Sequence, residues 1–466
     1  MEYRYRDASE MKDSGVEWIG KIPKYWEINK LKNISSIYGR IGFRGYTVND
    51  LVSEGEGAIT LSPSNIEEQK LKLDKLTYIS WEKYEESPEI KVYNEDIVFV
   101  KTASVGKVAY IEGLLEKATI NPQFVVFKNI KMNKKLLYYI LVSNVIQEQI
   151  NSGINGGVVN TLTQQDINNY YIPYQNNIEQ EKIANFLDKK TLQFDSIISK
   201  KEALIEKLEE AKKSLISEVV TGKVKVVKTD DGYELVKRSS EEMKDSGVEW
   251  IGCIPKGFKI VRLGLISFVT KLAGFEYTNN MAEALSNEGE VPIVRAGNIK
   301  MNKFINQEKE FIDIETSKLL NRSALYQKCV LITFIGAGIG EVALFDKVER
   351  HHLAPNVAKI EILGENKNKI DEQYLIYYLM SSAGQEEVNK IKKASAQPSL
   401  SMETIRNMKI VIPELDEQYE IKEYLARRIK EIEHIIDKTK IQIEKLKEAK
   451  QSIISEAVTG KIEIID

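Results

Sequence analysis

Ten basic and polar side chains lie in glycine-rich or polar segments that do not have the pattern of a core. Arg and Lys can bind guanine or phosphate, and Asn can pair with the edge of adenine, so these residue types suit recognition of duplex DNA. In the first half of the chain they are Arg40 and Arg44 in YGRIGFRGYT, and Lys101, Thr102, Ser104 and Lys107 in KTASVGK. In the second half they are Lys271, Arg295, Asn298 and Lys300.

Two other motifs have the form of a methyltransferase site. Phe334-Ile335-Gly336-Ala337-Gly338 spells FxGxG, which such enzymes use to turn backbone toward their cofactor, and Asn121-Pro122-Gln123-Phe124 approximates their NPPF motif. Gln123 stands where the second proline belongs, and the two motifs lie in different halves of the chain. We therefore expect 336–340 to form a strand-and-turn segment, an expectation that cofactor binding by the purified chain would overturn.

Other catalytic or metal chemistry has little support in the residues. No GxxxxGK[ST] phosphate loop is present, so the sequence does not predict an ATPase. Three histidines and two cysteines are too few for a Cys/His zinc site, although a carboxylate site stays open. We expect the adjacent His351 and His352 to be surface or packing residues. Cys253 replaces Lys21 of a near-identical segment, which argues against a need for its thiol.

The composition favours a folded chain without a membrane span. The 466 residues predict two to four domains at about 150 residues each. The longest uncharged stretch, 329–340, is about a dozen residues, whereas a spanning helix needs roughly twenty. The N-terminus lacks the apolar core of a signal peptide, and the two cysteines suggest no disulfide framework. We therefore expect a cytoplasmic protein with no membrane partner.

The chain is a duplicated unit. MKDSGVEWIGKIPK at 11–24 returns at 243–256 with one change, and IEKLEEAKKSLISEVVTGK at 205–223 returns at 443–461 with fifteen of nineteen positions identical. Between these anchors the copies diverge almost completely. This variable filling contains short β-rich runs such as 97–100, 124–127, 330–334 and 409–412, with helical patches at 136–149 and 374–391, and predicts an α+β fold.

A long amphipathic helix is predicted at the end of each copy. Apolar residues recur mostly three, four or seven positions apart over 183–215 and 421–453, and each segment lies between a proline (Pro173, Pro413) and a glycine (Gly222, Gly460). A helix over about 182–219 would be roughly 57 Å long, and its apolar seam needs a partner. We expect the two helices to form an antiparallel coiled coil with internal pseudo-twofold symmetry. Independent surface helices or an intermolecular coiled coil are the alternative.

Local charge supports a nucleic-acid ligand more than total charge does. The whole chain carries a net charge of -3, so any DNA site must be a local patch. Segment 24–44 has five basic residues against one acid, and the equivalent segment 256–271 has four basic residues and no acid. Two similar domains related by a dyad would suit duplex DNA, which has local dyads and repeats its groove every ~34 Å.

The openings MKDSGVEWIGxIPK and the closings IEKLxEAKxSxISExVTGK, alternating over essentially the whole chain, resemble the DNA-specificity subunit of type I restriction-modification systems. The resemblance implies two target-recognition domains, each reading half of a bipartite, gapped sequence in double-stranded DNA. It implies paired helices that space the domains and dock two modification (methyltransferase) subunits, with restriction (endonuclease and translocase) subunits joining for cleavage. It also implies no catalysis in this chain, with S-adenosylmethionine, ATP and Mg²⁺ on the partner subunits.

This reading predicts a definite division of the chain. We expect a first target-recognition domain at 1–177, a spacer helix at 178–222, a linker at 223–242, a second target-recognition domain at 243–416, and a C-terminal spacer helix and tail at 417–466. Two rival functions stay open: a coiled-coil adaptor that spaces two protein-binding domains, and a DNA methyltransferase. Steeply salt-dependent binding of duplex DNA would argue against the adaptor.

Overall fold

The computed structural model describes residues 2–40, 45–153, 161–230, 232–394 and 399–465, and the chain divides into two compact units. The first unit combines Met1–Glu202 with Lys440–Asp466, and the second is Ala203–Thr439. Both ends of the chain therefore belong to the same unit. No helix in the described part of the chain is long and apolar enough to span a membrane.

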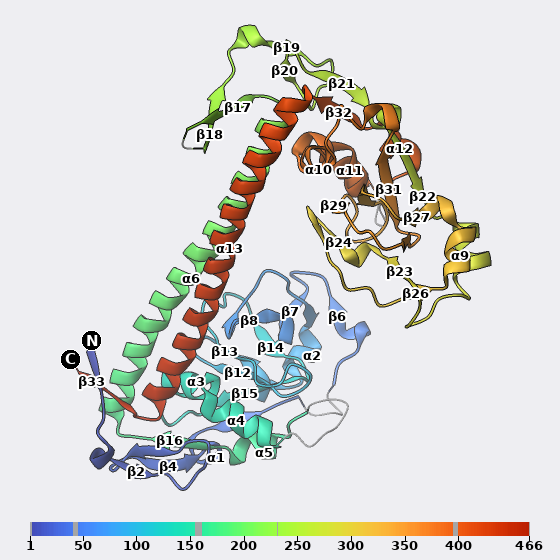
Figure 1. Ribbon diagram of the computed structural model, residues 1–466. Coiled ribbons are helices and arrows are strands. Elements are labelled where there is room, and N and C mark those ends of the chain that lie inside the picture. Colours follow the sequence, from blue (N-terminus) through green and yellow to red (C-terminus); the bar gives the residue numbers. More distant parts are fainter. Residues whose placement is uncertain (1, 41–44, 154–160, 231, 395–398, 466) are drawn as a thin grey trace. The chain divides into compact units, whose positions relative to one another are not determined.

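The first unit is built on two sheets and a layer of helices (Figure 1). A four-stranded sheet has the order β13-β12-β15-β5, and a five-stranded sheet has the order β11-β14-β7-β10-β6. Their bounds are β5 Ser36–Tyr38, β6 Leu51–Val52, β7 Gly57–Leu61, β10 Tyr78–Ser80, β11 Lys91–Val92, β12 Ile97–Val100, β13 Val108–Tyr110, β14 Ala118–Ile120 and β15 Phe124–Lys128. The helix layer on the four-stranded sheet includes α3 Lys134–Val142, α4 Asn144–Gly153 and α5 Gln164–Asn169, whereas α2 Trp81–Glu85 packs against β7 and β10 of the other sheet.

Strand β12 shows why the four-stranded sheet lies in the middle of this unit. All four of its residues are fully buried, and successive side chains of a strand point to opposite faces. Ile97 and Phe99 pack into the core shared with the helices, whereas Val98 and Val100 pack into the core between the two sheets. The continuous apolar run of a strand buried on both faces is thus explained.

The second unit repeats this plan with two four-stranded sheets. Their orders are β22-β31-β28-β29 and β26-β23-β30-β27. The bounds are β22 Ser267–Lys271, β23 Val291–Val294, β26 Phe311–Ile312, β27 Ala324–Leu325, β28 Cys329–Thr333, β29 Val342–Phe345, β30 His351–Leu353 and β31 Val357–Ile362, with helices α10 Glu372–Met380, α11 Ser382–Ala394 and α12 Met402–Asn407. The α+β expectation and the four strand runs are confirmed.

Each helical patch expected from the sequence is in fact two helices. The break falls at Ser143 in the first unit and at Ser381 in the second. Both serines are buried, and each hydroxyl donates to a carbonyl three residues earlier, of Ile140 and Tyr378 respectively. A serine that bonds its own preceding turn ends the helix and lets the chain change direction.

Two 44-residue helices, α6 (Asn177–Val220) and α13 (Leu415–Val458), are each about 66 Å long at 1.5 Å per residue. In the first unit the Lys450 Nζ lies 2.6 Å from an Asp195 carboxylate oxygen. In the second unit the Lys212 Nζ lies 3.5 Å from Glu433. As the residue number rises along α6, that of its partner on α13 falls, so the helices are antiparallel, as expected.

The helices end as the sequence predicts. Gly222 and Gly460 adopt φ angles of +72° and +67°, and the Lys223 and Lys461 amides donate to carbonyls five residues earlier, the pattern of a glycine-terminated helix. The segment 223–242, expected as a linker, contains a hairpin of β17 (Val224–Thr229) and β18 (Gly232–Lys237). In the first unit the corresponding ladder joins β1 (Glu2–Tyr5) to β33 (Ile462–Ile465).

A pair of glycine substitutions tests how tightly these helix ends are packed. Gly15→Ala introduces a side chain at φ +73° into open space. We therefore expect the free energy of unfolding to fall by about 1 kcal/mol, from the left-handed backbone alone. A Cβ on Gly460 would lie 2.6 Å from Pro23 and 3.0 Å from Trp26. Gly460→Ala should therefore lower the free energy of unfolding by about 1–3 kcal/mol more than Gly15→Ala does. Urea denaturation of the two variants measures both changes in stability. Equal changes would show that Pro23 and Trp26 move aside for the new side chain without a loss of stability.

Candidate nucleic-acid interface

Four loops of the first unit meet at one edge of its four-stranded sheet. The loop after β12 is held from two sides, because the Lys101 amide donates to the Gln123 carbonyl and the Leu162 amide donates to the Lys101 carbonyl, each at 2.8 Å. Thr102 forms a bridge with Thr161. Gly39, at the end of β5, lies so close to Gln164 that a Cβ would be 2.6 Å from its Nε2. Loops far apart in sequence thus form one surface.

The second unit has the same arrangement. The Phe334 amide donates to the Asn356 carbonyl at 3.1 Å, and the Leu400 amide donates to the Phe334 carbonyl at 2.8 Å. Ile335 forms a bridge with Ser399, which corresponds to the bridge of the first unit. The two copies therefore share the framework of this loop edge while its side chains differ.

A glycine with positive φ shapes the main loop in both units. The carbonyls of Gly106 (φ +87°) and Gly340 (φ +84°) each accept a hydrogen bond from the side-chain amide of a glutamine on the neighbouring helix, Gln147 at 3.2 Å and Gln385 at 2.9 Å. A Cβ on either glycine would collide with that glutamine. The glycines are thus explained by a turn packed against a helix, and 336–340 forms the expected turn after β28.

The approximate NPPF motif also has a structural explanation. The Asn121 side chain accepts a hydrogen bond from the Gln123 amide at 2.9 Å and donates to its Oε1 at 3.0 Å. An Asn that bonds the backbone two residues ahead stabilises a turn. This turn joins β14 to β15 and presents Gln123 at the loop edge.

The candidates of the KTASVGK loop lie at this edge. Ser104 is exposed, and Lys101 and Thr102 are half-buried. The Lys107 Nζ donates to the Ile66 carbonyl at 3.3 Å, so its charge is partly engaged within the unit. Arg44 lies outside the described residues.

Arg40 is buried, in contrast to the exposed position expected from the sequence. Its side chain is 6% exposed, and its guanidinium donates to the Ile120 carbonyl and to the Thr119 hydroxyl, each at 3.3 Å. Burial lowers the pKa of Arg40, with nearby acids and Tyr46 acting in the opposite direction. These contacts give Arg40 a structural role at the end of β14. Its position in a polar, glycine-rich segment did not reveal this role, because the acceptors lie some eighty residues away.

The second-unit candidates are placed in different ways. The Lys271 ammonium lies 4.7 Å from the centroid of the Phe334 ring, at the loop edge. Arg295 is partly exposed and pairs with Glu310, and the Lys300 Nζ lies 3.3 Å from Glu341. All three cations are near the surface, but two of them have an acid beside them.

Asn298 is the second candidate that the structure buries. Its Oδ1 accepts from the Arg295 amide at 2.9 Å and its Nδ2 donates to the Ile305 carbonyl at 3.0 Å, with the residue 6% exposed. Asn65 makes the equivalent bonds in the first unit, to Ser62 and Lys72. Both copies therefore use a buried Asn to close the same loop.

Sequence reasoning missed part of the loop edge. Thr161, Thr163, Asn356 and Ser401 are exposed or lie beside the predicted loops, yet none has a distinctive residue type. The sequence feature that could have located them is the start of the next helix. Thr163 and Ser401 are the N-caps of α5 and α12, and each accepts a hydrogen bond from the amide three residues later. That shared signal marks equivalent loops in the two copies.

The two histidines, predicted to be surface or packing residues, are buried in β30. His352 contacts the Ser323 hydroxyl and the Leu320 carbonyl, and burial lowers its pKa. The described residues contain no group of three or more His, Cys, Asp or Glu side chains that could hold a metal ion.

The sequence matches one family model twice. This model, described as the type I restriction modification DNA specificity domain, matches residues 23–210 and 255–445. Each match covers the sheets and loop edge of one unit together with most of one long helix.

Full-length relatives and a solved structure agree with this match. The chain is 25% identical over 468 residues to a putative type I restriction enzyme MjaX specificity subunit of Methanocaldococcus jannaschii, with 96% of each covered. It is 21% identical over 462 residues to the type I restriction enzyme EcoKI specificity subunit of Escherichia coli, with 95% of this chain and 90% of that protein covered. A chain from a structure of the assembly and conformational transition of a type I restriction-modification system has a TM-score of 0.67 at 14% identity, with 94% and 99% covered.

Two substitutions separate structural from surface polar residues at the loop edge. Asn298→Ala leaves the Arg295 amide and the Ile305 carbonyl without their partner, so we expect a loss of about 1–3 kcal/mol. Arg295→Ala removes one partly exposed ion pair and should cost at most about 1 kcal/mol. Urea denaturation measures both, with Asn65→Ala as the matched variant for Asn298→Ala. A larger loss for Arg295→Ala would reverse the assignment.

Proposed function

This chain belongs to the family of type I restriction-modification DNA specificity domains and carries two copies of the domain, and on that premise we propose how it specifies DNA. It is a specificity subunit in which each unit acts as a target-recognition domain. Each domain reads one half of a bipartite, gapped site in double-stranded DNA. The two halves differ because the loops of the two domains differ.

One observation carries the proposal: the same loop edge is built twice on nearly unrelated side chains. The loop after β12 reads KTASVGK, with two lysines and no acid, whereas the equivalent loop after β28 reads FIGAGIGE. Backbone bonds to equivalent neighbours hold both loops. A repeated frame that presents different side chains is what recognition of two different half-sites requires.

The residues proposed to contact DNA are those that this edge leaves at or near the surface. In the first domain they are Lys101, Thr102 and Ser104, and in the second they are Lys271, Arg295 and Lys300. Lys107 would act from the base of its loop. Arg40 and Asn298 would support the loops from within, and Arg44 remains a proposal from sequence alone.

The chain is proposed to have no catalytic activity of its own. Two modification subunits would dock on the long helices and carry S-adenosylmethionine, and restriction subunits would bring ATP and Mg²⁺, in a cytoplasmic complex. Exposed apolar side chains on both helices support docking, because such groups gain from a partner that covers them. They are Ile178, Leu192, Ile197 and Leu204 on α6, and Tyr419, Ile435 and Ile441 on α13.

The proposed function is tested by co-expressing the chain with its neighbouring modification subunit and mapping methylated adenines across the genome. We expect a two-part motif with a fixed gap that disappears when the chain is deleted. A culture that lacks only the modification subunit is the control for background methylation. Methylation that persists without this chain would show that another protein sets the specificity.

A single substitution tests the loop edge of the first domain. Lys101→Ala should weaken binding of the cognate duplex and lower the slope of log K against log salt by about 0.9, the effect of one lost phosphate contact. Lys101 forms no ion pair with another described residue, so the substitution breaks none and the domain should fold as before. Lys131→Ala is the matched control, because the exposed Lys131 lies beyond the end of β15 that is opposite to the loop edge, and it should bind like the wild type. An unchanged salt slope for Lys101→Ala removes this residue from the interface.

A further inference from the structure

A two-residue turn in the first unit has an unusual backbone for its sequence. Strands β8 (Ile66–Glu67) and β9 (Lys70–Leu71) form a short hairpin, and the turn between them places Glu68 at φ +47° and Gln69 at φ +63°. This left-handed region favours glycine or asparagine, so two long side chains persist there only when their contacts hold them. The contacts made by this hairpin therefore indicate its role.

One set of contacts fixes the hairpin to its own domain. The Gln69 Oε1 accepts from the Val108 amide at 2.7 Å, and the Gln69 carbonyl accepts from the Tyr138 hydroxyl at 2.8 Å. The Lys107 Nζ donates to the Ile66 carbonyl. The hairpin is thus tied to the four-stranded sheet through β13 and to α3.

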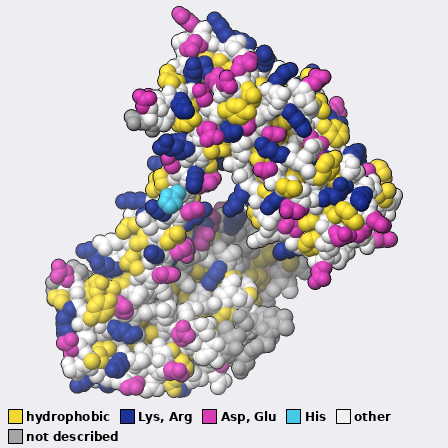
Figure 2. Space-filling view, in the orientation of Figure 1, with side chains coloured by type: hydrophobic (Ala, Val, Ile, Leu, Met, Phe, Trp, Pro, Cys, Tyr) yellow, Lys and Arg dark blue, Asp and Glu magenta, His cyan; other side chains and the backbone are white. Residues whose placement is uncertain are grey.

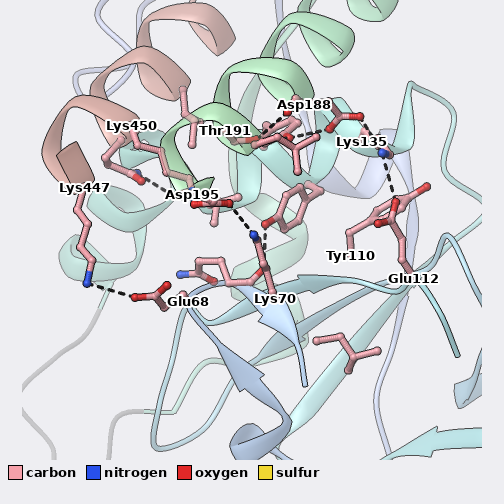
Figure 3. Close-up of a pocket in the computed structure, with 18 of the residues that line it drawn as sticks. Glu68, Lys70, Tyr110, Glu112, Lys135, Asp188, Thr191, Asp195, Lys447 and Lys450 are labelled. Carbon is pink, nitrogen blue, oxygen red and sulfur yellow. Dashed lines mark hydrogen bonds and ion pairs between the residues drawn. The ribbon is translucent and has the colours of Figure 1, made fainter. Parts of the chain in front are cut away.

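A second set of contacts reaches both long helices (Figure 3). The Lys70 Nζ lies 2.5 Å from one oxygen of Asp195 on α6, and the Lys450 Nζ on α13 lies 2.6 Å from the other. Beside them the Glu68 carboxylate lies 3.2 Å from the Lys447 Nζ on α13. One short hairpin therefore makes an ion pair with each helix, and Asp195 joins all three elements.

The electrostatics keep this network charged. Partial burial would raise the pKa of Asp195, but the hydrogen bonds and charges of Lys450 and Lys70 outweigh it and lower the pKa below its ordinary value. The carboxylate is therefore ionised near neutral pH. Hydrogen bonding to Glu68 likewise raises the pKa of Lys447.

The junction beside the hairpin is partly hollow. A cavity of about 620 Å³ lies between the domain and the helices, lined by Tyr110, Lys135, Tyr139, Asp188 and Thr191 as well as the hairpin residues. A hollow junction offers few packing contacts that could replace a lost ion pair. The ion pairs of the hairpin, here called the tie, add to the bonds that Lys135 and Tyr139 of α3 make to Asp188 of α6 at the same junction.

The second unit has the ion pair between the two long helices, but its described residues show no ion pair from the equivalent hairpin to those helices. Lys212 and Glu433 repeat the pairing of Lys450 with Asp195. The equivalent hairpin, β24 (Ile299–Lys300) and β25 (Lys303–Phe304), has Met301 and Lys303 in place of Glu68 and Lys70. Among the described residues Lys303 makes no ion pair, although it is exposed.

We propose that the β8–β9 hairpin is a positioning element that holds the first target-recognition domain at a fixed angle on the helix pair and thereby restricts the gap allowed between the two half-sites. This inference rests on the proposed function and adds to it a determinant of gap length outside the recognition loops. Glu68 and Lys70 act through Asp195, Lys447 and Lys450 and need not contact DNA.

The test uses the complex of the full chain with its modification subunit and measures methylation of duplexes with the native gap and with one base pair more or less. Combining Glu68→Ala with Lys70→Ala should lower the preference for the native gap about three- to fivefold, as expected for loss of two partly exposed ion pairs. The preferred half-site sequences should not change. Lys70→Arg, which keeps the charge, should preserve the preference.

Lys303→Ala is the matched control, because it removes the equivalent lysine of the untied hairpin and should leave the gap preference unchanged. A charge exchange, Glu68→Lys with Lys447→Glu, should retain the preference that each single change reduces. An unchanged preference in the double alanine variant, or an equal loss in Lys303→Ala, overturns the inference. A wild-type complex that methylates no two-part site overturns the proposed function instead, so the two failures are distinguishable.

Discussion

The structure depends on one constraint: a 44-residue amphipathic helix exposes an apolar seam that it cannot bury by itself. Both long helices meet this constraint by entering the cores of the units. The first core contains Ile183 and Leu187 of α6 with Ile454 and Val458 of α13, and the second contains residues of the same two helices from their other halves. Neither unit has a complete core without both helices. The helix positions outside these cores carry many Lys and Glu residues, and on the face of the molecule seen in Figure 2 basic and acidic side chains are intermingled.

The same constraint explains which parts of the sequence repeat. The residues that recur nearly unchanged are the helix ends and the segments that pack against them, such as Gly222 against Pro255 and Gly460 against Pro23. The Gln180 and Gln418 side chains, 238 positions apart, each accept from the amide that precedes a domain helix, of Asn133 and Asp371. These joints have to fit a common helix geometry. The loops at the sheet edge are held through their backbone by equivalent neighbours in the two units, so their side chains are free to diverge.

Local pattern was sufficient to predict whatever local physics determines. The duplication, the strand at Ile97–Val100, the long helices and their ends at Gly222 and Gly460 all follow from periodicity or from glycine chemistry, and the structure contains them. The burial of Arg40 depends on acceptors about eighty residues away that the fold brings near, and a polar segment does not reveal it. Asn298 bonds only within its own loop, but its residue type alone does not show that the loop closes around it. The tie made by Glu68 and Lys70 was missed for the same reason, because their partners lie on helices more than a hundred residues away.

Each copy of the repeat opens with a segment that contacts a glutamate near the start of a long helix. Comparing this contact in the two units shows which of its bonds both copies have. In the first unit Glu179 accepts hydrogen bonds from Arg6, Tyr25 and Trp26. In the second, Gly257 and Phe258 stand in place of the tyrosine and the tryptophan, and the corresponding Glu417 keeps the arginine, Arg238. Burial then raises the pKa of Glu417, although Arg238 opposes it, so this carboxylate costs stability as pH rises from its unfolded toward its folded pKa. The second copy thus retains the ion pair of this joint and lacks the two uncharged donors, while Phe258 packs beneath the Arg238 guanidinium.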